Sequence, residues 1–359
     1  MRIAIDAMGG DHAPREIVRG AAAGLGFLGE QDELILFGDQ DVIRAEREQA
    51  GLDDPRVRVQ HCSQNIEMDE SPMDALRQKR DSTIFQMASA AGKGACDALI
   101  SAGNTGAFAA ACQLRIKPIE GVSRPGIAVV MPTFHGPVVL CDVGANVAPK
   151  PRHLYEYARM CDIYSRIVLG VEQPQIGIVS IGEEEQKGNT LVREARDLIK
   201  RDSALRFVGN VEGRDIFAGR GNVFICDGFV GNVVLKLTEG LAEGLFKTIF
   251  REIEQEGAHM VEQFRPVVQR IWKRHDFAEY GGAPLLGINS VAIICHGRSD
   301  QRAISNAIRV AVEELRANLN AMIAERLRPP GADAPGEPPA SEASVVPARA
   351  DAHADGAAE

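Results

Sequence analysis

Four short apolar segments of this chain each run into a cluster of Gly, Asn and Asp, and at least two of these clusters lead into a helix. Strands that alternate with helices predict an α/β fold, with a largely parallel sheet sandwiched by helices. Ligands of such sheets bind beyond the carboxyl ends of the strands. The clusters are DAMGGD at 6–11, SAGNTG at 101–106, CDVGAN at 141–146 and DGFVGN at 227–232.

Small residues before a helix leave backbone N–H groups unpaired, and the helix dipole there favours negative charge. One such cluster is equally well explained as a tight turn. Four of them favour a protein that binds an anion, most simply phosphate.

We expect residues 1–328 to form one catalytic α/β domain with two lobes. Residues 329–359 are rich in Pro, Ala, Gly and Glu without apolar periodicity, which predicts a disordered tail without a role in catalysis.

Residues of about 237–278 predict a helical hairpin, because apolar side chains recur at helical spacing on both sides of a break near Gly257. Such a hairpin either protrudes and pairs with a second copy or lies on a membrane surface; the alternative is packing inside the core. Its key residues are Leu245, Phe246, Ile249, Phe250 and Trp272, the last surrounded by cations.

The formal net charge of -10 argues against a nucleic-acid partner. Seven scattered cysteines without CxxC spacing are typical of a reduced cytosolic enzyme. No basic-then-apolar leader opens the chain, and no apolar run approaches the roughly 20 residues that span a bilayer. We expect a cytoplasmic protein, at most peripheral to a membrane.

Standard cofactor and metal motifs are absent from the sequence. It contains neither GxGxxG before a helix nor GxxxxGK[ST], and it has no HExxH and no metal-type cluster. We therefore predict no cofactor and no metal.

The first cluster is the most distinctive string. Gly9 and Gly10 let the backbone approach a ligand closely. Asp6 and Asp11 can orient amides or a cationic partner, and His12 can exchange protons near neutral pH. The alternative is a sharp turn capped by Asp11.

The other clusters supply amides, hydroxyls and cations. Asp142 and Asn146 would face the same side of the sheet as the second cluster if the strands are parallel. Arg77, Lys79 and Arg80 gather positive charge, which is either a solvated helix face or a contact for phosphate or an acidic carrier. The candidates are Gly103, Asn104, Thr105, Gly106, Asp142, Asn146, Lys187, Asn232, Lys236, Arg77 and Lys79.

Five strings in order carry a resemblance that runs from residue 1 to about 327. They are DAMGGD at 6–11, SAGNTG at 101–106, DVGAN at 142–146, GFVGNVVLK at 228–236 and YGGAPLLG at 280–287. Together they resemble the phosphate acyltransferase family of phospholipid synthesis, the PlsX type.

The resemblance implies reversible transfer of a fatty acyl group from acyl-[acyl-carrier-protein] to inorganic phosphate. The acyl phosphate product would feed a membrane glycerol-3-phosphate acyltransferase on the way to phosphatidic acid. It also implies a fold similar to phosphotransacetylases and to isocitrate and isopropylmalate dehydrogenases, and a homodimer at the inner face of the cytoplasmic membrane.

Phosphate is a competent nucleophile at pH 7, so the enzyme needs mainly to position it and to stabilise the oxyanion. We expect Lys187, Arg77 and Lys79 to position phosphate. We expect Asn104, Asn146 and Asn232 to hold phosphate or the carbonyl oxygen, Asp142 to orient one of those amides, and His12 to protonate the departing thiolate.

Three other functions stay open from the sequence. They are an acyl-CoA phosphotransacetylase, an NAD-dependent dehydrogenase of similar fold, and a non-catalytic acyl-carrier or membrane scaffold.

Overall fold

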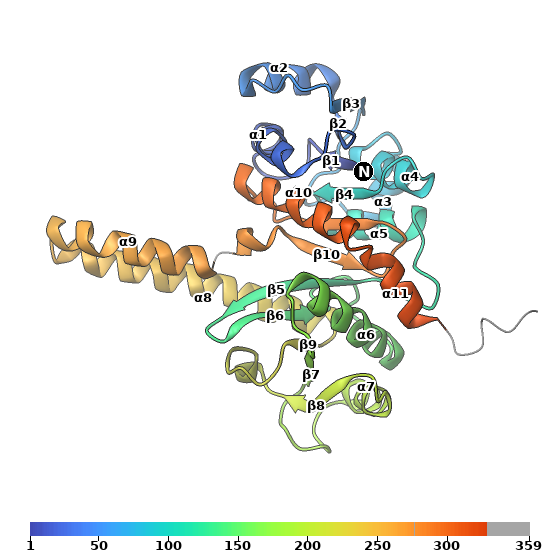
Figure 1. The fold of residues 1–359 in the computed structure, drawn as a ribbon, viewed down its shortest axis with the longest axis vertical. Coiled ribbons are helices and arrows are strands. Elements are labelled where there is room, and N and C mark those ends of the chain that lie inside the picture. The colour runs from blue at the N-terminus through green and yellow to red at the C-terminus, as the bar shows by residue number, and fades with distance from the viewer. Residues whose placement is uncertain (276, 329–359) are drawn as a thin grey trace, which may run out of the picture. The chain divides into compact units, whose positions relative to one another are not determined.

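One mixed sheet runs through the described part of the chain, in the order β3-β2-β1-β4-β11-β10-β5-β6-β9-β7-β8 (Figure 1). The structure is a computed structural model that describes residues 1–275 and 277–328, without the side chains of residues 272–278. The predicted tail therefore lies outside the described residues. The strands are β1 (Arg2–Asp6), β2 (Glu33–Gly38), β3 (Val57–His61), β4 (Ala98–Ser101), β5 (Gly126–Thr133), β6 (Gly136–Cys141), β7 (Gln175–Val179), β8 (Arg206–Val211), β9 (Val223–Ile225), β10 (Ala283–Leu286) and β11 (Val291–Ile294).

The sheet is mostly parallel, as predicted, but its middle is not. β10 pairs antiparallel with both β11 and β5, and β5 pairs antiparallel with β6. Three reversals in succession make β6, β9 and β7 run opposite to β1, β4 and β11. Asp142 was expected to face the same side of the sheet as the second cluster, residues 101–106, if their strands were parallel. β4 and β6 run in opposite directions, so this condition is not met.

Helices cover both faces of the sheet, and the period-2 alternation of the strands explains why. Ile3 and Ile5 pack under α1 and α10, whereas Ala4, between them, packs with α4 and α5. The helices are α1 (Arg15–Gly24), α2 (Gln40–Ala50), α3 (Pro72–Gln78), α4 (Thr83–Gly92), α5 (Thr105–Arg115), α6 (Pro151–Val168), α7 (Thr190–Arg201), α10 (Gln301–Arg316) and α11 (Leu319–Leu327), with short 3-10 turns at Leu25–Phe27, Gly213–Phe217 and Phe277–Tyr280.

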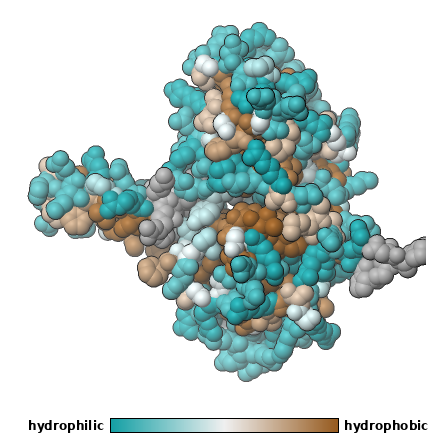
Figure 2. All heavy atoms as spheres, in the orientation of Figure 1, coloured by the Kyte–Doolittle hydropathy of each residue, from teal (hydrophilic) through white to brown (hydrophobic). Residues whose placement is uncertain are grey.

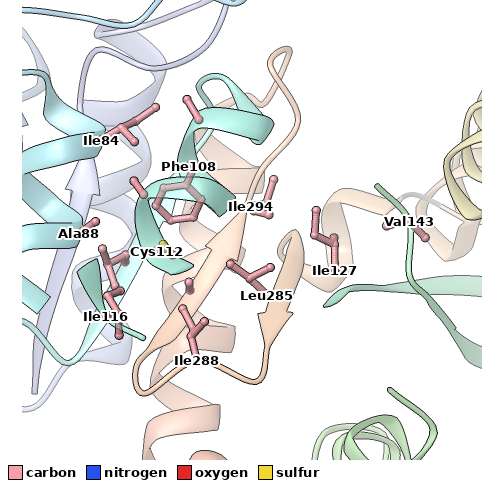
Figure 3. Close-up of a cluster of buried hydrophobic side chains, with 14 of the residues drawn as sticks. Ile84, Ala88, Phe108, Cys112, Ile116, Ile127, Val143, Leu285, Ile288 and Ile294 are labelled. Atoms are coloured by element: carbon pink, nitrogen blue, oxygen red, sulfur yellow. The ribbon is translucent and has the colours of Figure 1, made fainter. Parts of the chain in front are cut away.

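One continuous apolar core joins the two halves of the sheet. Phe108 of α5, Leu285 of β10 and Ile127 of β5 belong to the same buried cluster (Figure 3). A separate core lies under α6, α7 and α11. Because β10 and β5 share a core with the first half, the two halves are held by packing as well as by the sheet.

The predicted hairpin consists of α8 (Gly228–Gln255) and α9 (Ala258–His275), and the turn between them contains Gly257 at φ 102. Only Gly228 and Gly231 are buried in α8. Most of this hairpin lies outside the core, and its hydrophobic atoms gather along one edge (Figure 2).

The exposed apolar residues of α8 include Leu237, Leu241, Leu245 and Ile249. Phe246 and Phe250 are half-buried. The backbone of Trp272 lies in α9, and its side chain is outside the described part. Within residues 1–275 and 277–328, none of the helices combines the length and the apolarity that a bilayer crossing requires.

Candidate active site

The exit of β6 is organised around the buried carboxylate of Asp142. Its Oδ1 accepts from the backbone N–H groups of Ile127, Gly144 and Ala145 over 3.0, 3.1 and 2.9 Å. Its Oδ2 accepts from the N–H of Asn146 over 2.7 Å and lies 3.4 Å from that residue's Nδ2. Burial raises the pKa of the Asp142 carboxyl, and the backbone hydrogen bonds oppose this. The buried carboxylate therefore fixes the backbone of the third cluster, residues 141–146.

The Asn146 side chain is held by neighbouring groups of the protein. Its Nδ2 donates to the Pro125 carbonyl over 2.7 Å and lies 2.8 Å from the Tyr157 hydroxyl. Because the amide hydrogens are engaged there, Asn146 fixes the loop in this structure.

The start of α8 packs directly on this loop. Asp227 caps the helix by accepting from the N–H groups of Phe229 and Val230 over 3.0 and 2.9 Å. A Cβ at Gly231 would lie 1.9 Å from the carbonyl oxygen of Asp142, and one at Gly228 would lie 2.7 Å from that of Asn146. The two glycines allow the third and fourth clusters to touch.

The first two clusters meet around another buried carboxylate, that of Asp6. Ser101 Oγ donates to its Oδ2 over 2.8 Å and accepts from the Gly103 N–H over 3.1 Å. A Cβ at Gly9 would lie 2.8 Å from the Gly103 nitrogen. Burial raises the pKa of Asp6, and hydrogen bonds from Ser101 and from the backbone oppose this. Each half of the sheet thus has a buried Asp at a strand exit.

The loop after β11 joins these two clusters. The Asp11 N–H donates to the Gly297 carbonyl over 2.7 Å, and Gly10 takes φ 105 beside it. A Cβ at Gly10 would lie 3.0 Å from the same carbonyl oxygen, so the backbones approach closely here.

The start of α5 has N–H groups available to a ligand. Asn104 caps the helix by accepting from the Ala107 N–H over 3.0 Å, and its Nδ2 donates to the carbonyls of Glu67 and Glu70 over 3.1 and 3.0 Å. Thr105 and Gly106 are exposed, and in the described chain their N–H groups have no acceptor. The second cluster therefore offers an anion its backbone, while the Asn104 amide is engaged.

α8 connects the two sets of loops. Two turns after its start, the Lys236 ammonium lies 3.1 Å from Nε2 of His296 in the loop after β11, and it pairs with Glu239 over 2.8 Å. Burial and the Lys236 charge lower the pKa of His296.

Several predicted residues are not brought into this arrangement. Lys187 is exposed in the loop after β7. Lys79 donates to Glu70 over 2.6 Å and to the Asn65 carbonyl over 2.8 Å, so it holds the 65–70 loop. Arg77 is 73% exposed and lies 3.7 Å from Asp74. The side chains of His12 and Asn232 are exposed too.

Two residues of the site were missed as candidates, Asp227 and His296, whereas Asp6 was expected to orient amides or a cationic partner. His296 follows β11 in the string Cys295-His296-Gly297, a strand exit with a glycine, and this was the signal that could have found it. A surface hollow of about 590 Å³ lies elsewhere, between α2 and β3, and none of the predicted site residues lines it.

The cysteines next to the site are poor nucleophiles. Cys141 and Cys226 flank Asp142 and are fully buried, and burial raises the pKa of both thiols well above the usual range. The thiolate, which is the reactive form, is therefore disfavoured.

Solved structures of phosphotransacetylases share this fold. A phosphotransacetylase from Streptococcus pyogenes aligns with a TM-score of 0.62 at 19% identity, over 88% of this chain and 94% of that one. The EutD phosphotransacetylase from Staphylococcus aureus aligns with a TM-score of 0.57 at 15% identity, over the same shares.

Sequence comparison identifies the family. Residues 1–322 match the family described as "Fatty acid synthesis protein". The phosphate acyltransferase of Heliobacterium modesticaldum is 46% identical over 332 residues, which cover 91% of this chain and 98% of that protein. That of Desulfitobacterium hafniense is 47% identical over 317 residues, covering 87% and 93%. As the five strings indicated, the chain belongs to the phosphate acyltransferase family and is an acyltransferase.

Proposed function

We propose that this enzyme transfers a fatty acyl group reversibly from acyl-[acyl-carrier-protein] to inorganic phosphate, giving acyl phosphate and free carrier. The family supports phosphate as the acceptor. The structural observation that carries the proposal is the position of α8, which starts against the Asp142 loop and, through Lys236, reaches the loop after β11. That loop in turn contacts the loop after β1. A phosphate beside Lys236 would thus be bordered by both halves of the sheet.

In the proposed reaction a phosphate oxygen attacks the carbonyl carbon of the thioester. The carbon–sulfur bond breaks, and the thiolate of the carrier leaves and takes a proton from solvent. Backbone N–H groups at Thr105 and Gly106, together with Lys236, hold the phosphate. The close glycine contacts at Gly9, Gly10 and Gly103 position the loops around it.

Three polar side chains of these loops then act by positioning. They are Asn104, Asp142 and Asn146, whose hydrogen bonds to backbone groups hold the loops that carry the phosphate-binding donors. Lys187 and Arg77, both exposed, are proposed as contacts for phosphate or for the acidic carrier. His12 and Asn232 remain candidates at the rim, and Lys79 supports the neighbouring loop.

The acyl donor is tested directly. The purified full-length protein is given phosphate with palmitoyl-[acyl-carrier-protein] or with palmitoyl-CoA, and acyl phosphate is trapped with hydroxylamine. We expect the carrier thioester to give the higher kcat/KM. A higher kcat/KM with palmitoyl-CoA would favour an acyl-CoA phosphotransacetylase instead.

The nucleophile is tested by the kinetic pattern. Direct attack by phosphate requires both substrates on the enzyme, so double-reciprocal plots should intersect. Parallel plots, together with exchange of labelled carrier into acyl carrier in the absence of phosphate, would indicate an acyl-enzyme and contradict direct attack.

We further propose that the enzyme is a cytoplasmic homodimer that touches the membrane peripherally and delivers acyl phosphate to a membrane glycerol-3-phosphate acyltransferase for phosphatidic acid synthesis. The exposed apolar face of the hairpin supports a contact of this kind, because large exposed apolar patches mark interaction surfaces.

The membrane contact is tested with Leu245→Glu, which places a charge on the apolar face. Lys247→Gln, which changes the net charge by the same amount at an exposed position on the opposite side of α8, is the control. We expect Leu245→Glu to reduce flotation with anionic lipid vesicles and Lys247→Gln to leave it unchanged. Normal flotation together with a loss of the dimer in light scattering would assign this face to dimerisation alone.

A further inference from the structure

Both ring nitrogens of His296 face a hydrogen-bond donor. The backbone N–H of Arg298 points at Nδ1 over 3.2 Å, and the Lys236 ammonium lies 3.1 Å from Nε2. A neutral imidazole carries one N–H and accepts only at its other nitrogen. In one of the two contacts, therefore, two hydrogen-bond donors face each other.

The contact in which two donors face each other is the one at Nε2. The Arg298 N–H is held within the same short loop, and in the described chain Nδ1 is its only acceptor. Lys236 is exposed and forms an ion pair with Glu239, and a lysine ammonium has only donors. Nδ1 therefore accepts from Arg298, and Nε2 carries the proton and faces Lys236.

Two donors side by side require a shared acceptor. Building on the proposed function, we propose that this acceptor is an oxygen of the inorganic phosphate substrate, held between Lys236 Nζ and the N–H of a neutral His296. The loop contact between Asp11 and Gly297 places this pair beside the first cluster.

The charges around the pair explain the use of a neutral donor. Lys236 and Arg298 bring positive charge, while Glu239 and Asp11 bring negative charge, and all four act on His296. The imidazole adds a directed N–H without adding a further charge. His296 is thus a substrate-binding residue, and it does not serve as the acid that protonates the thiolate.

The kinetic test compares KM for phosphate in the wild type and in His296→Ala, His296→Gln and His61→Ala. Gln places an amide N–H near the position of Nε2. His61 is a matched control, because its Nδ1 also accepts a backbone N–H, from Gln40 over 3.2 Å, outside the site. We expect His296→Ala to raise the phosphate KM roughly 10- to 100-fold, as for loss of one hydrogen bond to a charged group.

The same test predicts recovery in His296→Gln, an unchanged acyl-donor KM, and wild-type behaviour in His61→Ala. An unchanged phosphate KM in His296→Ala, or a rise in the acyl-donor KM alone, would overturn the assignment. If the wild type made no acyl phosphate at all, the proposed function would fail instead.

Two further measurements test the proposed phosphate contact without an activity assay. Calorimetric titration with inorganic phosphate should show weaker binding to His296→Ala than to the wild type, and equal binding would refute the site. In ¹⁵N-histidine spectra assigned with His296→Ala, we expect the Nε2–H tautomer, and an Nδ1–H tautomer would refute the hydrogen-bond argument.

Discussion

The replacement Asp142→Asn tests whether one buried carboxylate shapes the loop that meets α8. Asp142 receives four backbone N–H groups and the side-chain amide of Asn146. An Asn keeps one oxygen, which can retain the three donors at Oδ1. Its NH₂ group then faces the N–H of Asn146, another donor.

The expected magnitude follows from these bonds. A buried N–H without an acceptor costs about 1–3 kcal/mol, and three bonds to a neutral oxygen replace three to a carboxylate. The smaller desolvation of a neutral side chain offsets part of this loss. We expect the free energy of unfolding to fall by about 3 kcal/mol, and kcat to fall about 100-fold, because small displacements of positioning loops have effects of that size.

The assay pairs urea denaturation with acyl phosphate formation at a temperature where both proteins are folded. Asp162→Asn is the control, since Asp162 is also buried but bonds to Arg166 on α6. It should lower stability while kcat stays normal. Wild-type kcat in folded Asp142→Asn would refute the positioning role.

Two further changes have defined outcomes. Gly231→Ala should abolish most activity, because its Cβ would lie 1.9 Å from the Asp142 carbonyl oxygen, while Gly240→Ala, with open space around it, should stay active; equal rates would argue against the α8 contact. Burial raises the pKa of Glu314, on α10, from its ordinary value of 4.5 to about 8. The stability that its proton contributes is therefore fully present below pH 4.5 and is lost as the pH rises from there through about 8. Glu314→Gln should therefore exceed the wild type in unfolding free energy by about 1 kcal/mol at pH 5 and about 4 kcal/mol at pH 8, and a difference independent of pH would contradict this.

Local patterns in the sequence were sufficient for most of the fold. Apolar strands followed by Gly-rich exits and capped helices predicted the α/β sheet, and Gly257 marked the break in the hairpin. The reversal of strand direction was not predicted, because it depends on β10 inserting between β11 and β5. The pairing of Leu285 with Ile127 joins residues far apart in the chain.

The sequence indicated which strand-exit loops carry polar residues, but it did not indicate the hydrogen-bond partners of their side chains. Asn104 and Lys79 have the chemistry of ligand-binding groups, but their partners are backbone carbonyls and a carboxylate supplied by the 65–70 loop. Hydrogen bonds between distant loops leave no periodic signal in a single sequence. His296 was missed because a lone histidine after a strand becomes a candidate ligand-binding residue only through its contact with Lys236 of α8.

The central claim is that inorganic phosphate binds where α8 crosses the strand-exit loops. A crystal structure of the enzyme with phosphate tests it most directly. We predict one phosphate within hydrogen-bond distance of Lys236 Nζ and His296 Nε2, beside the loops after β1 and β11. An ordered phosphate that contacts neither side chain would contradict the account.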